Sequence, residues 1–188
     1  MASAFLILHG LSGSGPGHWQ RWLQERLTQD GHKVRFPDLP DPDTPDPDTW
    51  RREVLAELAG LDSDERVVIC HSLSCVTWLA VSQELKRPVD RVALVAPPSL
   101  RAGLRELEPF FPVTATAQDV ANAAKHTRLF CSDNDPYCPE GAASLYGGPL
   151  DLPIDLLPGG GHLNVDAGLG PWPAMEAWAQ GAKNGVET

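Results

Sequence analysis

The chain has 188 residues, 42% of them hydrophobic, and a formal net charge of −10 at pH 7. This length and composition suit one sizeable core, so we expect a single domain over residues 1–188. The acidic charge argues against a nucleic acid or an anionic membrane as a partner.

Two further features bear on the compartment. No apolar run approaches the roughly 18 residues of a membrane-spanning helix, and the first residues lack the basic region of a signal peptide. The four cysteines show no C-x-x-C spacing, so we expect reduced thiols rather than a zinc site or a disulfide framework. Together these features predict a cytoplasmic protein.

Short apolar runs alternate with helix-like segments along the chain. The predicted strands are residues 5–8, 33–36, 67–70, 91–95, 127–131 and 154–157. The predicted helices are residues 18–29, 49–61 and 73–85, with weaker ones at 117–125, 140–145 and 172–180. Continuous Val, Ile and Leu strands that alternate with helices are typical of a parallel sheet with helices on both faces. We therefore predict an α/β fold with right-handed crossovers.

A glycine-rich loop, residues 9–18, follows the first predicted strand and leads into a helix. Nucleotide-binding loops have the same layout. However, G-x-G-x-x-G would need a glycine where His18 stands, and the Walker pattern would need a Lys-Ser/Thr pair that this loop lacks. In a hydrolase, the backbone N–H near Leu11 would instead contribute to an oxyanion hole. We expect His9 and His18 to order this loop rather than to take part in chemistry.

The string Cys70-His71-Ser72-Leu73-Ser74 lies between a β-branched run and a predicted helix. A small-x-Ser-x-small string in this place is the layout of a nucleophile elbow, whose tight turn presents the serine at a helix N-terminus. In that case Leu73 supplies the second N–H of the oxyanion hole, and we expect His71 to point away from the pocket. The flanking residues are not the usual two glycines, so a strand followed by a Ser-capped helix is an alternative interpretation of this pentapeptide.

Two later strand ends carry residues that fit with Ser72. Asp133 and Asp135 follow the fifth predicted strand, and His162 follows the sixth after three glycines. The order Ser, Asp, His, with each residue just past the carboxyl end of a strand, is typical of the α/β-hydrolase triad. A metal ion or cofactor has no part in this chemistry, and we expect neither.

The segment of residues 97–112 is too long for a plain connection, and the lid of α/β-hydrolases inserts at this place. A segment of this length makes only a minimal lid, so we expect an open site. Phe110, Phe111 and Trp172 are the apolar candidates to border an acyl pocket. As an alternative, the two phenylalanines anchor the segment to the core. A small apolar site of this kind suits short acyl groups.

Four strings resemble the retinoblastoma-binding protein 9 / YdeN-type family of small serine hydrolases. They are HGLSGSGPGHW (residues 9–19), CHSLSC (70–75), SDNDPYCP (132–139) and GGGHLNVDAGLGPW (159–172). The match extends from about Phe5 to Trp178. The resemblance implies a compact α/β-hydrolase fold with a minimal lid, and a six-stranded parallel sheet in the order 2-1-3-4-5-6.

The resemblance also implies the roles of the site residues. Ser72 corresponds to the nucleophile, Asp135 to the acid and His162 to the base, while Asp133 is expected to cap its loop. One departure lies at the elbow, where Cys70 and Ser74 stand in place of the family's glycines. Their Cβ atoms are expected to strain the approach of the helix to the strand.

From these residues we expect a serine hydrolase that cleaves a carboxylic ester, or a related acyl bond, through an acyl-enzyme intermediate. Its partner would be a small acyl substrate, and the sequence gives no motif for a protein partner. Two alternatives stay open. One is a binding protein that has kept the fold and lost turnover, because a fold does not by itself imply activity. The other is a thioesterase or peptidase with the same triad.

Overall fold

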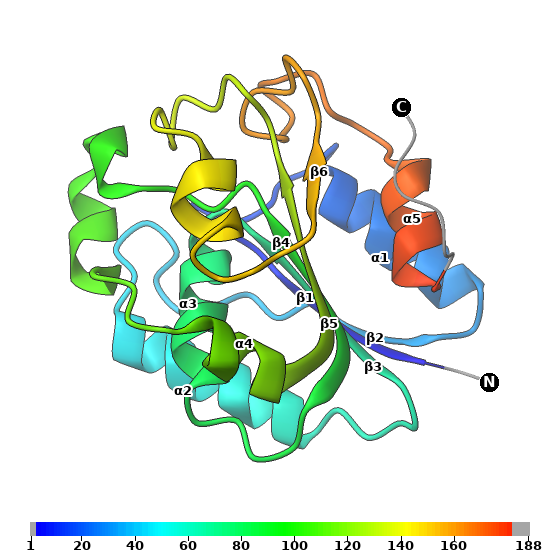
Figure 1. The fold of residues 1–188 in the computed structure, drawn as a ribbon. Helices are drawn as coiled ribbons and strands as arrows, with labels where there is room; N and C mark the ends of the chain where they lie inside the picture. Colours follow the sequence, from blue (N-terminus) through cyan, green and yellow to red (C-terminus); the bar gives the residue numbers. More distant parts are fainter. Residues whose placement is uncertain (1–2, 182–188) are drawn as a thin grey trace.

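The computed structural model describes residues 3–181, and a six-stranded sheet runs through the middle of them (Figure 1). The strands are Ala4–Leu8 (β1), Lys33–Arg35 (β2), Arg66–His71 (β3), Val89–Val95 (β4), Ala124–Cys131 (β5) and Ile154–Leu156 (β6). Their order is β2-β1-β3-β4-β5-β6, and each neighbouring pair is parallel. The predicted α/β fold and strand order are confirmed.

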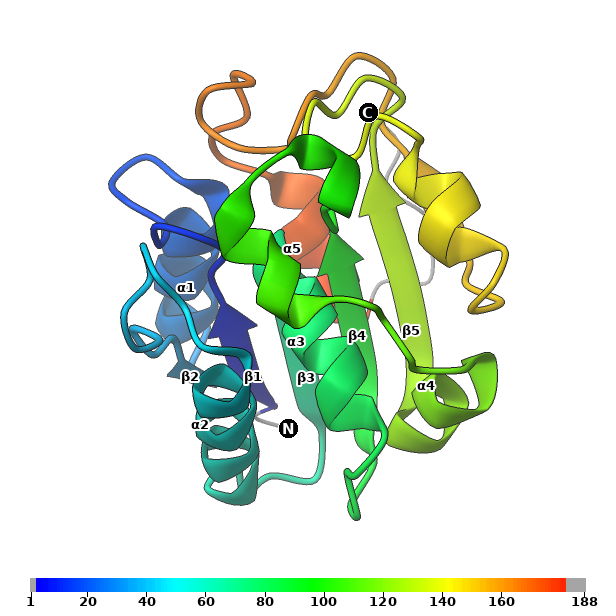
Figure 2. The same cartoon turned by 90° about the vertical axis from the view of Figure 1, so that its left-hand side faces the viewer.

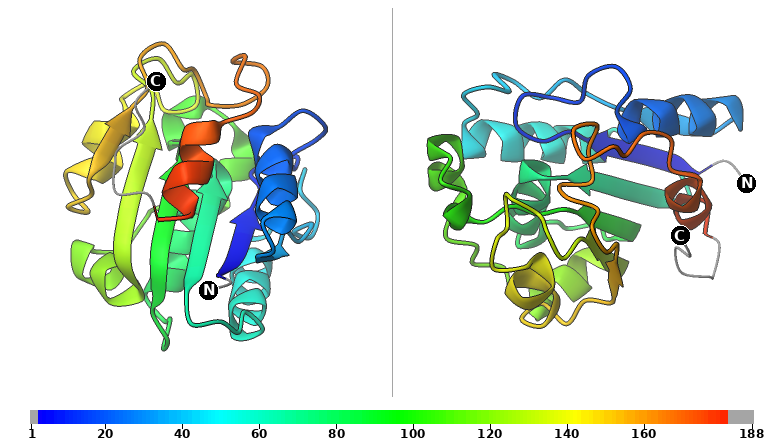
Figure 3. Two further views of the ribbon diagram at one scale, coloured as in Figure 1. Left: turned by 90° about the vertical axis from the view of Figure 1, so that its right-hand side faces the viewer. Right: turned by 90° about the horizontal axis from the view of Figure 1, so that it is seen from above.

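Helices cover both faces of this sheet. The α-helices of the described residues are Trp19–Gln29 (α1), Pro47–Ala59 (α2), Leu73–Ser82 (α3), Ala117–Ala123 (α4) and Pro173–Ala179 (α5). Helices α2, α3 and α4 lie on one face (Figure 2). Helices α1 and α5 lie on the other (Figure 3). Within residues 3–181 we find no helix with the length and apolar character of a membrane span.

In the central strands β1 and β3, successive buried residues pack against the helices on opposite faces of the sheet. In β1, Phe5 and Ile7 join the buried cluster under α1 and α5, whereas Leu6 and Leu8 join the cluster under α2, α3 and α4. Successive side chains of a strand point to opposite faces, so a strand covered on both sides must be apolar throughout. This explains the unbroken apolar runs in the sequence.

Element bounds differ from the predictions in a few places. Helix α2 begins two residues before the predicted start, because Asp46 caps it through the Thr49 N–H (2.8 Å) and Pro47 fits the first helical position. The lid segment contains two 3₁₀ helices, Leu100–Ala102 (η1) and Arg105–Phe110 (η2). The predicted helix at residues 140–145 is a single π turn, Ala143–Gly147 (η3).

The strand register brings the functional loops together. Leu8 pairs with Cys70, and Cys131 pairs with Leu156, so the carboxyl ends of β1, β3, β5 and β6 lie along one edge of the sheet. The loops that follow these strands meet above that edge (Figure 1). Ligands of open parallel sheets bind at this edge.

Candidate active site

Ser72 occupies the sharp turn between β3 and α3. Its backbone angles, φ 57° and ψ −124°, lie in a region that residues with a Cβ rarely adopt. The Ser72 N–H donates to the Val95 carbonyl (2.8 Å), and helix α3 begins at the next residue. This geometry is that of a nucleophile elbow, with the hydroxyl at the N-terminus of a helix.

The two elbow residues that stand in place of glycines, Cys70 and Ser74, are both fully buried. Ser74 is fully buried, and its Oγ accepts a hydrogen bond from the His71 N–H (3.0 Å). The same hydroxyl is within donating distance of the carbonyls of Leu8 and His71, at 2.9 Å each. Cys70 is buried in the core under α2, α3 and α4. Ser74 therefore links the end of β1 to the elbow, a role that a glycine could not fill.

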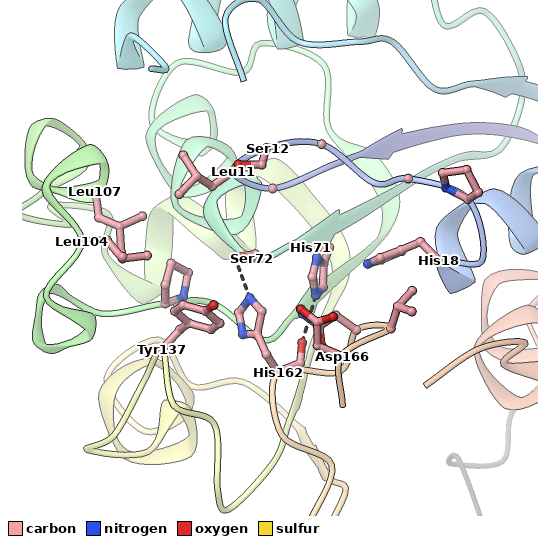
Figure 4. Close-up of a pocket in the computed structure, with 17 residues that line it drawn as sticks. Leu11, Ser12, His18, His71, Ser72, Leu104, Leu107, Tyr137, His162 and Asp166 are labelled. Atoms are coloured by element: carbon pink, nitrogen blue, oxygen red, sulfur yellow. Dashed lines mark hydrogen bonds between the residues drawn. The ribbon is translucent and has the colours of Figure 1, made fainter. Parts of the chain in front are cut away.

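The residues predicted as a triad lie in hydrogen-bond contact (Figure 4). His162 Nε2 is 2.8 Å from Ser72 Oγ. His162 Nδ1 is 3.0 and 2.9 Å from the two carboxylate oxygens of Asp135. A carboxylate can only accept, so Nδ1 carries the ring proton and Nε2 is free to accept from the serine hydroxyl. All three side chains are buried.

The loop that carries Asp135 also holds the loop that carries His162. Asp133 Oδ1 accepts the Gly159 N–H and Asn134 Oδ1 accepts the Gly161 N–H, both at 2.7 Å, and the Ser132 hydroxyl donates to the Gly161 carbonyl. The expected loop-capping role of Asp133 is thus present in the structure. The sequence did not predict the contact of Asn134 with the loop that carries His162, because a polar residue in a turn gives no sign of a partner on another loop.

His71 lies toward the pocket, so the expectation that it points away is wrong. Its Nε2–H donates to the His162 carbonyl (3.0 Å), and the centroids of the two rings are 5.0 Å apart. Strand alternation explains this position: Cys70 faces the α2, α3 and α4 layer, so its neighbour faces the opposite layer, where Leu163 packs. Burial, with the nearby His162 and His18, holds the pKa of His71 well below its usual value.

The first loop approaches Ser72 closely at Gly10. A Cβ added at Gly10 would lie 2.7 Å from the Ser72 Cβ, so only glycine permits this approach. His9 orders the loop, as expected: its Nε2 accepts the Leu39 N–H at 2.8 Å. In the loops and caps of residues 3–181, neither the Leu11 N–H nor the Leu73 N–H donates a hydrogen bond. Both predicted oxyanion donors are therefore unpaired in the described chain.

Comparison with known proteins agrees with this geometry. A family model for serine hydrolases matches residues 5–180. The chain belongs to the serine hydrolase family. It is 25% identical over 179 residues to the Bacillus subtilis (strain 168) protein YdeN, covering 93% of each chain. The crystal structure of the ydeN gene product has a TM-score of 0.85 at 23% identity and covers 96% of this chain and 98% of that one.

A more distant match concerns the fold alone. The structure of Est1E from Butyrivibrio proteoclasticus, with ferulic acid bound, has a TM-score of 0.68 at 12% identity. It covers 87% of this chain and 82% of that one. The family model and the match to YdeN support the YdeN-type serine hydrolase family that the sequence motifs indicate.

A cavity of about 390 Å³ opens above Ser72 and His162 in this serine hydrolase (Figure 4). Its walls come from the first loop, the lid segment, Tyr137 and residues 164–166. Its volume is in the range of small-molecule sites. In the described part of the chain, no group of three or more His, Cys, Asp or Glu side chains is arranged to hold a metal ion.

The three aromatic residues predicted to border the pocket do not line it, and this prediction is wrong. Phe110 is buried against Trp50, and Phe111 packs on the same cluster, as in the alternative that they anchor the lid segment. Trp172 is buried, with its ring edge-on to Trp19 at 5.3 Å. These three aromatic side chains therefore pack in or against the core and do not border the cavity.

The lid segment lines the cavity with Leu104 and Leu107 instead. These two residues and Phe110 are spaced by three, the repeat of a 3₁₀ helix, so they lie along one side of η2. The first two reach the cavity, and Phe110, one turn further, reaches α2.

Proposed function

We propose that this serine hydrolase cleaves carboxylic esters with Ser72 as nucleophile, His162 as base and Asp135 as the acid of the triad. The observation that carries the proposal is the hydrogen-bonded series from Ser72 Oγ through His162 to Asp135 at the base of an open cavity. Nucleophile and base lie within hydrogen-bond reach, and a third group orients the base, as covalent acyl transfer requires.

In the first half of the reaction, Ser72 Oγ attacks the ester carbonyl carbon while His162 Nε2 takes the hydroxyl proton. Asp135 holds the Nδ1–H and stabilises the imidazolium that forms. The unpaired N–H groups of Leu11 and Leu73 donate hydrogen bonds to the carbonyl oxygen and stabilise the negative charge that develops on it. The bond between the carbonyl carbon and the alkoxy oxygen then breaks as His162 gives its proton to that oxygen, and the alcohol leaves.

In the second half, His162 takes a proton from water, and the resulting hydroxide attacks the acyl carbon of the acyl-enzyme. The Ser72 Oγ–acyl bond breaks, the proton returns from His162 to Ser72 Oγ, and a carboxylic acid is released.

The cavity of about 390 Å³ and the short lid favour small acyl groups, so we infer a preference for short over long chains. The four free, buried cysteines support a reducing, cytoplasmic location.

The first prediction is that Ser72→Ala lowers kcat/KM for p-nitrophenyl butyrate by about a thousandfold or more, because the nucleophile is lost. Steady-state kinetics with acetate, butyrate and octanoate esters measures both the loss and the chain-length preference. Ser144→Ala, on an exposed turn away from the cavity, is the matched control. A Ser72→Ala protein with normal turnover would contradict the mechanism.

A further inference from the structure

The cavity has two chemically different ends, one on each side of Ser72. Leu104, Leu107 and Tyr137 lie at one end, and His18 and Asp166 lie at the other (Figure 4). Asn164 also belongs to the second end, because it shares a loop with Asp166 and lines the same cavity. A substrate that spans Ser72 therefore meets the leucine side chains on one side, and the polar side chains of His18, Asn164 and Asp166 on the other.

His18 at the polar end carries an unused hydrogen-bond donor. Its Nδ1 accepts the Gln20 N–H (3.2 Å) and caps helix α1, so the ring proton of the neutral form is on Nε2. That Nε2–H makes no hydrogen bond within residues 3–181, although the residue is only 6% exposed and lines the cavity. The Nε2 atom is not among the fully buried, unpaired side-chain atoms of the described residues, so it is open to the cavity, where a substrate oxygen can accept this hydrogen bond.

His18 is uncharged under ordinary conditions. Burial, with the nearby His162 and Arg21, lowers its pKa to about 4, so the ring is a neutral donor at neutral pH. Asp166 is exposed at the same end, and the chain has a formal charge of −10. This combination disfavours an anionic group and suits hydroxyl or ether oxygens.

The two ends also differ in their access to solvent. Leu107, a lid residue at the apolar end, is buried, whereas Val165 and Asp166, at the polar end, are exposed. The acyl group stays on the enzyme until water attacks, and the alcohol departs first. The apolar end, with the buried Leu107, thus fits the acyl group, and the polar end, with the exposed Asp166, fits the alcohol.

We propose that His18, with Asn164 and Asp166, forms a subsite for the alcohol part of the substrate. The substrate is then an uncharged ester of a short apolar acid and a hydroxyl-bearing alcohol. This inference rests on the esterase function proposed above. His18 determines specificity by donating its Nε2–H to an oxygen of the alcohol.

Two esters with the same acyl group separate this subsite from general esterase activity. Glycerol 1-monobutyrate and propyl butyrate differ only in the two hydroxyls of the alcohol. One hydrogen bond between uncharged groups corresponds to about a five- to tenfold preference. We expect wild-type kcat/KM to favour the glycerol ester by about that factor.

The decisive variant is His18→Asn. Asparagine is among the preferred N-cap residues, so helix α1 keeps its cap while the imidazole Nε2–H is lost. The ratio of the two kcat/KM values is expected to fall about five- to tenfold. His126→Asn, at an exposed position of β5 outside this cavity, is the matched control and keeps the wild-type ratio. Asp166→Leu tests the same end from an exposed loop, where folding is not at stake, and also lowers the ratio.

Each outcome bears on one proposal. Equal wild-type kcat/KM values for the two esters, or an unchanged ratio in both His18→Asn and Asp166→Leu, would overturn the polar subsite and leave the esterase proposal intact. Hydrolysis of neither ester, or of both by Ser72→Ala, would overturn the esterase proposal itself.

Discussion

Asp133 and Asp135 lie two residues apart on one loop but have different partners. Asp135 is buried, and its carboxylate accepts hydrogen bonds from His162 Nδ1–H and from the Tyr137 N–H at 2.8 Å. Asp133 is exposed and accepts the Gly159 N–H. The first is therefore placed to orient the base, and the second to hold the neighbouring loop.

The second prediction follows from this difference. Asp135→Asn removes the charge that stabilises the imidazolium and offers an amide that can turn its own donors toward Nδ1. We expect kcat to fall about 10³- to 10⁴-fold, the scale known for this change in a triad. Asp133→Asn keeps an acceptor oxygen for Gly159 and is expected to lower kcat only a few fold. Comparable losses in the two variants would contradict the assignment of the acid.

At the residue scale, the sequence shows the members of the triad but not their surroundings. Ser72 and His162 could be predicted because each lies in the loop or turn after a predicted strand, in the chain order typical of one superfamily. The direction of His71 could not, because it depends on the face that the last residue of β3 takes. Pocket-lining Leu104 was missed, because a leucine in a loop gives no sign of whether it meets the core or the cavity.

The elbow formed by the end of β3 and the start of α3 depends on one hydroxyl. Ser74 Oγ is the partner of the buried His71 N–H and contacts the carbonyl at the end of β1. The Leu8 carbonyl has a second partner in the Gln20 side-chain amide (2.9 Å), and the Ser74 hydroxyl also lies 2.9 Å from the His71 carbonyl. Loss of the hydroxyl therefore removes buried hydrogen bonds that join the elbow to the end of β1.

The third prediction is that Ser74→Ala lowers the free energy of unfolding by about 1–3 kcal/mol, because a buried hydroxyl that donates one hydrogen bond and accepts another is lost. Urea denaturation followed by circular dichroism measures it. Ser144→Ala, at an exposed turn, is expected to change the same quantity by no more than about 0.5 kcal/mol. If Ser74→Ala is as stable as the wild type, the hydroxyl does not link the strand to the helix.

At the scale of elements, the alternation of strands and helices could be predicted because both faces of the sheet are covered, which makes the buried part of each central strand apolar. The order of the strands came from the family resemblance, since apolar runs carry no information on neighbours. The 3₁₀ helices of the lid segment were not predicted, because their short runs follow contacts with α2 and the cavity rather than a helical pattern.

Across the whole molecule, buried histidines make the fold sensitive to acid. Burial lowers the pKa of His9, of His18 to about 4, and of His71 well below its usual value. In the unfolded chain these groups titrate near 6.5. Between the two values the unfolded chain binds protons that the folded chain does not, so the free energy of unfolding falls as the pH decreases.

The fourth prediction is a loss of stability between pH 7 and pH 4.5. The contribution of His18 is fully present above pH 6.5 and is lost progressively toward pH 4, with a total on the order of 3 kcal/mol at about 1.4 kcal/mol per pKa unit. The lowered pKa values of Asp46 and Asp119, whose carboxylates accept hydrogen bonds from Thr49 and Thr116, act only at lower pH.

Urea denaturation at several pH values tests this prediction. We expect His18→Asn to lose less stability than the wild type over the same range, because it lacks one of the buried imidazoles. Equal losses in the two proteins would show that His18 does not contribute to the acid sensitivity.

The central claim is that His162 activates Ser72 as a nucleophile. Reaction with a fluorophosphonate probe at neutral pH, followed by peptide mass spectrometry, tests it most directly. The account predicts one phosphonyl group per chain, on Ser72, with no labelling of Ser72→Ala and greatly slowed labelling of His162→Ala. An adduct on another residue, no adduct at all, or labelling of Ser72 at the wild-type rate in His162→Ala would contradict it.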